Sequence, residues 1–157
     1  ETLKSGIVNF KGIKRRYTKH NFDSGKIYID DYAHHPTELN AVIGSIKTFY
    51  PHKKLLVVFQ PHLFSRTRDF ADGFAESLDK ADELILLDIY PARELQENFE
   101  GITSKWLLEK IKLENKEIST LNEAFDKIKN KDFDVLLTVG AGNIDTLYDG
   151  IVEWLNG

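Results

Sequence analysis

Cysteine and methionine are both absent from this chain of 157 residues. Without cysteine the chain can form neither a disulfide framework nor a zinc site built on thiolates. The absence of methionine means that Glu1 is not an initiator residue. We therefore expect the chain to be a domain excised from a longer protein.

The chain also lacks a large charge of one sign and a long apolar run. Its net charge is -4 and its pI is about 5.7, which argues against a general binder of nucleic acid or anionic membranes. No stretch resembles a signal peptide or a membrane span, so we expect a soluble cytoplasmic protein with no membrane partner. The local exception is a basic cluster that would serve phosphate binding or only solubility, formed by Lys11, Lys14, Arg15, Arg16 and Lys19.

A phosphate-binding loop of the GxxxxGKS or GxxxxGKT type is absent, so the chain is not a self-sufficient P-loop ATPase. The nearest approach is Gly140-Ala141-Gly142, but Asp145 replaces the third glycine of the GxGxxG pattern. We interpret these glycines as a tight turn that lets the last helix pack on the sheet. Asn143 and Asp145 are expected to act as caps near that turn.

What the sequence does contain is a regular alternation of apolar and amphipathic segments. Arms near 15–20 and 26–31, around turn-forming residues, predict a β-hairpin. Strands covered by helices on both sides are predicted at 55–59, 84–87 and 135–139, with a shorter strand at 118–121. This order predicts a Rossmann-like, doubly wound α/β fold with a mainly parallel sheet, helices on both faces and an antiparallel N-terminal hairpin.

Four residues are expected at the starts of helices. Pro36 suits a first turn because its fixed φ fits that position. Serine, threonine and asparagine side chains can accept hydrogen bonds from the free amides of a first turn. We therefore expect Ser65, Thr103 and Asn122 to be N-caps.

Two polar runs, 30–38 and 59–67, each follow a predicted strand and precede a predicted helix. Open α/β sheets bind ligands at the carboxyl ends of their strands, so both runs are candidate sites. Arg66 would lie in the first turn of a helix, where free amides favour an anion, and its guanidinium can hold a carboxylate with two hydrogen bonds. His62 adds a group that titrates near neutral pH. An equally open reading makes Arg66 a solvated helix residue and His62 a turn residue.

In the first run, Asp31 at a strand end would accept hydrogen bonds from ribose hydroxyls or would act as a capping carboxylate. Asp30, His34 and His35 suggest metal ligands, but neighbouring side chains of an extended chain point to opposite faces. We therefore expect no metal site here and interpret Asp30 as a buried or capping acid.

The segments KGIKRRY, DDYAHHPTE, FQPHLFSRTRDF, DIYPARE and GAGNI occur in this order. In this order the chain resembles the carboxyl-terminal domain of the Mur ligases over nearly its whole length, and within that family the branch that joins L-alanine to UDP-N-acetylmuramate. The resemblance implies that residues 1–12 are the junction with a central domain and that 13–157 are the carboxyl-terminal domain. An amino-terminal domain would hold the UDP-sugar, and a central P-loop domain would hold ATP and Mg²⁺.

The resemblance also implies a reaction, in peptidoglycan biosynthesis, and roles for individual residues. ATP would phosphorylate the lactyl carboxylate of UDP-N-acetylmuramate, and the amine of L-alanine would attack the acyl phosphate. His34, His62 and Arg66 would face L-alanine, whereas Arg16 would approach the ATP phosphates and Asp31 the ribose. No residue is assigned a certain catalytic role, and the isolated chain is expected to be inactive.

One position departs from the commoner family pattern, because Leu63 stands where many members have arginine. Arg93 would compensate for the missing cation or would be an ordinary exposed loop residue. Three alternatives stay open for the whole chain: a domain of the ligase that recycles murein tripeptide, a stand-alone nucleotide-binding module, and a structural interaction domain.

Overall fold

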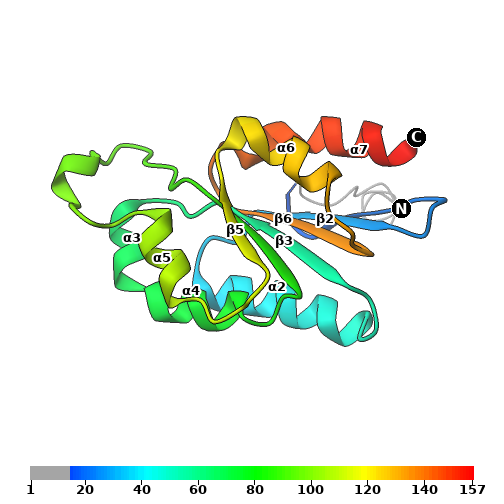
Figure 1. Cartoon of the computed structure of the whole chain (residues 1–157), viewed down its shortest axis with the longest axis horizontal. Helices are drawn as coiled ribbons and strands as arrows, with labels where there is room; N and C mark the ends of the chain where they lie inside the picture. The colour runs from blue at the N-terminus through cyan, green and yellow to red at the C-terminus, as the bar shows by residue number, and fades with distance from the viewer. Residues whose placement is uncertain (1–14) are drawn as a thin grey trace, which may run out of the picture.

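The computed structural model describes residues 15–157, which form one six-stranded sheet (Figure 1). The strand order is β1-β2-β6-β3-β4-β5; β1 pairs with β2 antiparallel, and every other pair is parallel. The strands are β1 (Thr18–Asn21), β2 (Ile27–Asp31), β3 (Leu55–Phe59), β4 (Glu83–Leu87), β5 (Lys116–Ser119) and β6 (Val135–Val139). This arrangement confirms the predicted fold class. The predicted junction, residues 1–12, lies outside the described residues.

Helices cover both faces of the sheet (Figure 1). They are α2 (Pro36–Phe49), α3 (Phe64–Asp69), α4 (Ala71–Leu78), α5 (Ser104–Lys110), α6 (Leu121–Lys129) and α7 (Tyr148–Asn156), with 3-10 turns η1 (Gln96–Asn98) and η2 (Asn143–Leu147). The apolar sides of α2, α4 and α5 share one core cluster, and those of α6 and α7 share the other.

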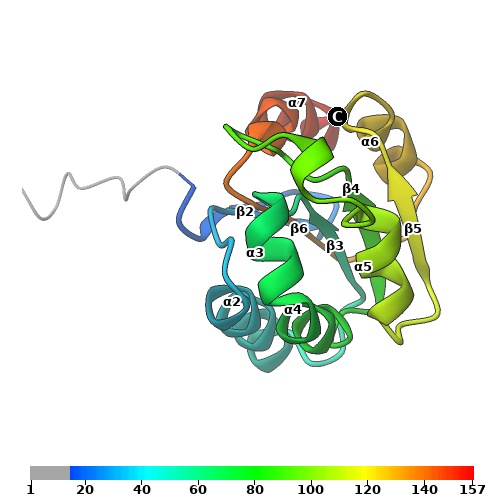
Figure 2. The same ribbon diagram turned by 90° about the vertical axis from the view of Figure 1, so that its left-hand side faces the viewer.

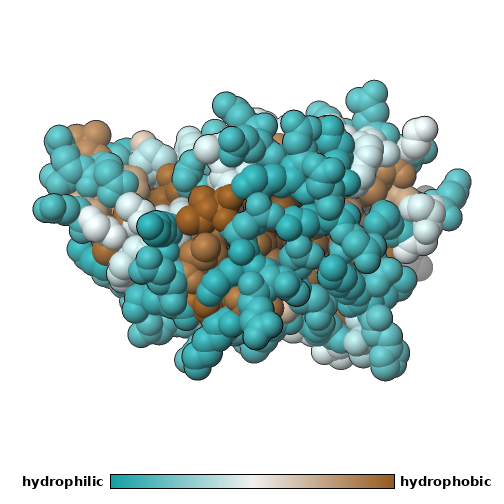
Figure 3. Space-filling view, in the orientation of Figure 1, coloured by the Kyte–Doolittle hydropathy of each residue, from teal (hydrophilic) through white to brown (hydrophobic). Residues whose placement is uncertain are grey.

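The two cores follow from the period of two along each strand. In β3, Leu55 and Val57 point into the first core cluster, whereas Leu56 and Val58 point into the second. All five β3 residues are buried, as predicted for a strand covered on both sides. The outer surface differs: Figure 3 shows a face covered mainly by hydrophilic residues, with apolar residues in small patches between them. Within residues 15–157, no helix is long and apolar enough to cross a bilayer.

Several predicted boundaries were wrong. β1 begins at Thr18 because Arg15 and Tyr17 have φ values of 64° and 49°, which are incompatible with a strand. Ser65 does not cap a helix, since α3 already begins at Phe64 and its N-cap position, Leu63, makes no side-chain bond. Phe70, with φ of -118°, then separates α3 from α4.

At the later helices, one predicted cap is confirmed and the others were wrong. Thr103 accepts a hydrogen bond from the Trp106 amide, as expected of an N-cap. The cap of α6 is Thr120 rather than Asn122, since the helix begins one residue earlier than expected. Asn143 and Asp145 make no cap hydrogen bond at η2 or α7, because both lie inside η2.

Candidate functional site

The connections of β2, β6 and β3 diverge to opposite faces of the sheet at the carboxyl ends of these strands. β2 and β3 continue into α2 and α3, whereas β6, which lies between them, continues into η2 and α7 on the other side of the sheet. The register aligns the three ends, because Val139 pairs with both Asp31 and Phe59. Figure 2 views the molecule from the end at which the long β4–α5 connection projects in Figure 1. Such a switch point is where doubly wound sheets bind ligands, and both predicted polar runs start there.

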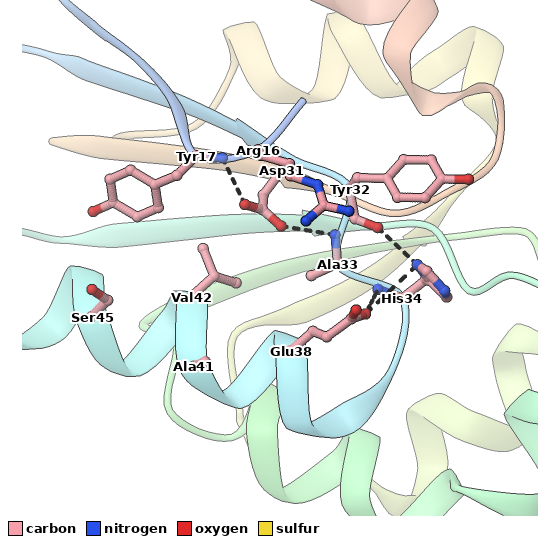
Figure 4. A pocket seen from close by; sticks show the side chains of 10 residues that line it. All are labelled: Arg16, Tyr17, Asp31, Tyr32, Ala33, His34, Glu38, Ala41, Val42 and Ser45. Carbon is pink, nitrogen blue, oxygen red and sulfur yellow. Dashed lines mark hydrogen bonds and ion pairs between the residues drawn. The ribbon is translucent and has the colours of Figure 1, made fainter. Parts of the chain in front are cut away.

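The first run borders a cavity of about 470 Å³ between residues 16–17, the end of β2 and the start of α2 (Figure 4). Arg16 and Asp31 both line it, as do the apolar side chains of Ala41 and Val42. The Asp31 carboxylate accepts hydrogen bonds from the Tyr17 amide at 2.7 Å and the Ala33 amide at 2.8 Å. Each carboxylate oxygen retains a lone pair for a ligand. The structure therefore brings the two predicted nucleotide-binding residues to one cavity.

Glu38 fixes the turn that carries His34. One Glu38 oxygen accepts from the His34 amide at 3.0 Å and the His35 amide at 3.1 Å. Although partial burial opposes it, these bonds hold the pKa of Glu38 below its usual value. His35 acts as the N-cap of α2 by accepting from the Thr37 amide. Residues 15–157 contain no group of three histidine or acidic side chains that could hold a metal ion.

The imidazole of His34 has a defined hydrogen-bond direction. Its Nδ1 lies 3.0 Å from the Tyr32 carbonyl oxygen, which can only accept, so Nδ1 carries the proton. In the neutral ring, Nε2 is then free to accept a hydrogen bond. The ring centroids of His34 and His62 are 6.2 Å apart, so the two polar runs meet at these histidines.

The second run enters α3 through a sharp turn. The Leu63 φ is 71°, and its amide donates to the Tyr90 carbonyl at 2.9 Å. Arg66 Nη1 then lies 3.1 Å from His62 Nδ1, and since a guanidinium can only donate, this nitrogen of His62 is the acceptor. The His62 ring stacks on Tyr90 with centroids 5.6 Å apart. His34, His62 and Arg66 thus form one cluster.

Burial, followed by the positive charge of Arg66, lowers the pKa of His62. Exposed Arg93 also lowers it, through its charge on the neighbouring loop, whereas Glu94 raises it. Arg93 makes no side-chain hydrogen bond or ion pair within residues 15–157. Arg93 is therefore an exposed loop residue, and its positive charge still acts on the pKa of His62.

Glu94 is a site residue that the sequence analysis missed. Its carboxylate accepts from the Ser65 amide at 3.0 Å and from the Ser65 hydroxyl. Although burial opposes it, these bonds, with the charge of Arg66, hold the pKa of Glu94 below its usual value. The expectation of a free anion-binding helix start was therefore wrong, because the chain supplies its own carboxylate there. Glu94 lies 29 residues from Ser65, and its sequence signals were its position after a buried strand and its place in the segment DIYPARE.

The glycines after β6 permit close packing of the turn. A Cβ on Gly140 would lie 2.7 Å from the Gln60 carbonyl oxygen, and a Cβ on Gly142 would lie 2.7 Å from Tyr90 Cβ. Gln60 also donates to Asn143 Oδ1 at 2.8 Å and accepts from the Ile144 amide at 2.9 Å. These contacts support the packing interpretation of the Gly140–Gly142 turn.

The comparisons with known proteins identify the family of this fold and site. A family model described as "Mur ligase, glutamate ligase domain" matches residues 15–142. The chain belongs to the Mur ligase family. The match includes every predicted site residue, from Arg16 to Arg66, and confirms the resemblance stated from the sequence.

Among Mur ligases, a UDP-N-acetylmuramate–L-alanine ligase of Flavobacterium johnsoniae is 50% identical over 156 residues, which is 99% of this chain and 34% of that protein. One of Cytophaga hutchinsonii is 47% identical over 145 residues, or 92% of this chain and 31% of that protein. The chain spans about a third of the length of these relatives.

Three solved structures share the fold. The UDP-N-acetylmuramate-alanine ligase MurC of Thermotoga maritima matches with a TM-score of 0.68 and 28% identity, covering 96% of this chain and 32% of that chain. A murein peptide ligase of Psychrobacter arcticus matches with a TM-score of 0.69 and 20% identity, covering 100% of this chain and 33% of that chain. A domain of a Haemophilus ducreyi ligase, at 0.65 and 18%, is covered over 99% of its own length and 89% of this chain.

Proposed function

We propose that this chain is the carboxyl-terminal domain of an ATP-dependent ligase that joins L-alanine to UDP-N-acetylmuramate in peptidoglycan biosynthesis. The observation that carries the proposal is the meeting of two clusters at the ends of β2, β6 and β3. Arg16 and Asp31 form a nucleotide half-site, and His34, His62 and Arg66 form an amino-acid half-site. Relatives with 42% to 50% identity are named for this reaction, which supports the choice of substrates.

The nucleotide half-site fits part of ATP. The free lone pairs of Asp31 suit the hydroxyls of a ribose, and the exposed guanidinium of Arg16 suits a phosphate. Ala41 and Val42 offer an apolar wall of the same cavity. As the family resemblance implies, Mg²⁺ and most of ATP would be held by a central domain of the longer protein.

The amino-acid half-site fits an α-amino acid. Arg66 uses one N–H on His62 and keeps others for the substrate carboxylate. His34, with its proton on Nδ1, offers Nε2 as an acceptor for the substrate amine. Holding both ends aims the amine lone pair at the acyl carbon.

In the proposed reaction, the ATP γ-phosphoryl group passes to a carboxylate oxygen of UDP-N-acetylmuramate and leaves ADP. The alanine amine then forms a C–N bond at that carbon, the C–O bond to phosphate breaks, and the amine loses a proton. This chain contributes positioning to both steps, by holding nucleotide and amino acid next to each other.

The test is phosphate release by the full-length ligase that contains this chain, with ATP, Mg²⁺ and UDP-N-acetylmuramate. L-Alanine and the murein tripeptide are offered in separate reactions. Release that depends on L-alanine is the expected result. Release only with the tripeptide would reassign the chain to the recycling ligase, and release with neither would return it to a nucleotide-binding or structural module.

A further inference from the structure

Asp30 is a buried acid that the proposed reaction does not use. It is 1% exposed and, as the neighbour of Asp31 in β2, it points to the opposite face of the sheet. Its Oδ1 accepts from the Thr138 hydroxyl at 2.9 Å, and that hydroxyl is 2.8 Å from the hydroxyl of Tyr28. Burial raises the pKa of Asp30, whereas Thr138 and Arg15 lower it. A carboxyl group at such a place requires a partner.

That partner is Arg15. Its Nε lies 3.5 Å from Asp30 Oδ2, is itself buried, and makes no hydrogen bond within the described part of the chain. Its Nη2 donates to the Gly140 carbonyl at 2.6 Å, and its guanidinium lies 5.2 Å from the centroid of the Tyr32 ring. The side chain of Arg15 therefore connects the end of β2 to the turn after β6.

The backbone of Arg15 is fixed at the same place. Its carbonyl accepts from the Tyr32 amide at 2.7 Å, and the Tyr17 amide donates to Asp31 at 2.7 Å. Arg15 and Tyr17 both have positive φ, which side chains other than glycine adopt reluctantly. The turn over residues 15–17 is thus unfavourable by itself and is held by these contacts.

We propose that the Arg15–Asp30 ion pair is a positioning device that holds the turn at residues 15–17, and thereby Arg16, against Asp31 in the nucleotide half-site. The inference rests on the proposed function for its consequence in catalysis. Arg15 and Asp30 are positioning residues in this scheme and touch no substrate.

A second cavity lies beside the ion pair. It measures about 260 Å³ and is lined by Arg15, Asp30, Asp145 and Asp149, among others. Asp145 is 48% exposed and lies 3.9 Å from Arg15 Nη1. Without the charge of Asp30, the guanidinium has both space and negative charges on that side, and the turn that carries Arg16 loses its anchor.

The matched variants are Asp30→Asn and Asp145→Asn. The first keeps an oxygen that accepts from Thr138 and removes the charge that faces Arg15; the second removes the exposed charge. In the chain, amide hydrogen exchange at Tyr17 and Tyr32 should accelerate about tenfold or more in Asp30→Asn and stay unchanged in Asp145→Asn. Acceleration spread evenly over the core strands would indicate general destabilisation and overturn the proposal.

In the full-length ligase, Asp30→Asn should raise the KM for ATP about tenfold with little change in the KM for L-alanine. NMR titration of the chain with ATP should show weaker binding by the same variant. Arg15→Gln, which removes the other charge, should reproduce both results, and the double variant should add little to either single one. Arg15→Gln also serves as the test variant if Asp30→Asn does not fold.

An unchanged KM for ATP in folded variants, or equal rises for ATP and L-alanine, would overturn the positioning role. Failure of the proposed function is a separate result, because it would appear as wild-type ligase without release dependent on L-alanine. The hydrogen-exchange test of the turn does not depend on either substrate.

Discussion

At the level of single residues, the proposed amino-acid half-site is built around the hydrogen bond between Arg66 and His62. The bond leaves Arg66 oriented and partly unsatisfied, and it fixes which nitrogen of His62 is protonated. Arg68, two residues later on α3, provides a natural comparison because it is exposed and bonds to Asp69.

Arg66→Ala should raise the KM for L-alanine about tenfold or more, since hydrogen bonds to charged groups contribute ~1.5–3 kcal/mol. The KM for ATP should change far less. Steady-state kinetics of the full-length ligase measure both values, and Arg68→Ala should leave both unchanged. Equal changes for the two substrates would contradict the carboxylate role of Arg66.

The lowered pKa of His62 predicts a pH dependence of folding stability. The pKa of His62 is 6.5 in its usual state and lower when folded, so the unfolded chain binds more protons between the two values. The contribution to stability is therefore fully present above pH 6.5 and is lost as the pH falls through the folded pKa. His62→Gln should flatten this part of the profile of unfolding free energy against pH.

NMR titration of the ring protons should place the pKa of His62 below 6.5 in the wild-type chain. Removal of the nearby positive charge in Arg66→Ala should raise it, whereas Arg68→Ala should have no effect. A His62 pKa that does not respond to Arg66→Ala would show that the charge of Arg66 does not act on the ring.

At the level of elements, two glycines in different surroundings should respond oppositely to alanine. Gly142→Ala places a methyl group against Tyr90 and Gln60 and should destabilise the chain by about 1–3 kcal/mol. Gly44 lies inside α2 with open space around it, so Gly44→Ala should stabilise by about 0.5–1 kcal/mol. Denaturant unfolding of the chain measures both, and destabilisation at Gly44 would contradict the assignment of open space.

The order and type of the elements were predictable because local patterns determine them. The buried strands at 55–59 and 135–139 were predicted with their observed bounds, and their apolar runs reflect burial on both faces. Helix starts were less predictable. Ser65 has the right chemistry for an N-cap, but Leu63 with its positive φ starts α3 earlier and releases Ser65 to Glu94.

The residues of the candidate site were predictable only where the chain order indicated them. Asp31, His34, His62 and Arg66 lie at the end of a strand or in the segment that follows it, so the expectation that they lie at one edge of the sheet followed from topology. Contacts between distant segments carried no local signal. The pair of Arg15 with Gly140, separated by 125 residues, is an example.

At the level of the whole molecule, residues 15–157 possess two core clusters and one continuous sheet in which each of the six strands is paired with a neighbour. Both faces of this sheet are covered by helices within these residues. We therefore expect the purified chain to unfold in one cooperative transition with a free energy of about 5–15 kcal/mol.

The same chain should release no phosphate from ATP when UDP-N-acetylmuramate and L-alanine are supplied, because it lacks a P-loop. Calorimetry and a phosphate assay test the two statements separately. Turnover by the purified chain would contradict the division of the site between domains, and broad, non-cooperative melting would contradict independent folding.

The position of β6 determines when this domain can fold during synthesis. β6 is the last strand in the chain, yet it lies between β2 and β3 and forms the bridge between the hairpin and the rest of the sheet. During synthesis, the earlier strands β2 and β3 cannot be joined into one sheet until residues 135–139 have been made, because β6 pairs with both of them. A polypeptide truncated before β6 should therefore expose the edges of β2 and β3 and become a substrate for chaperones and proteases.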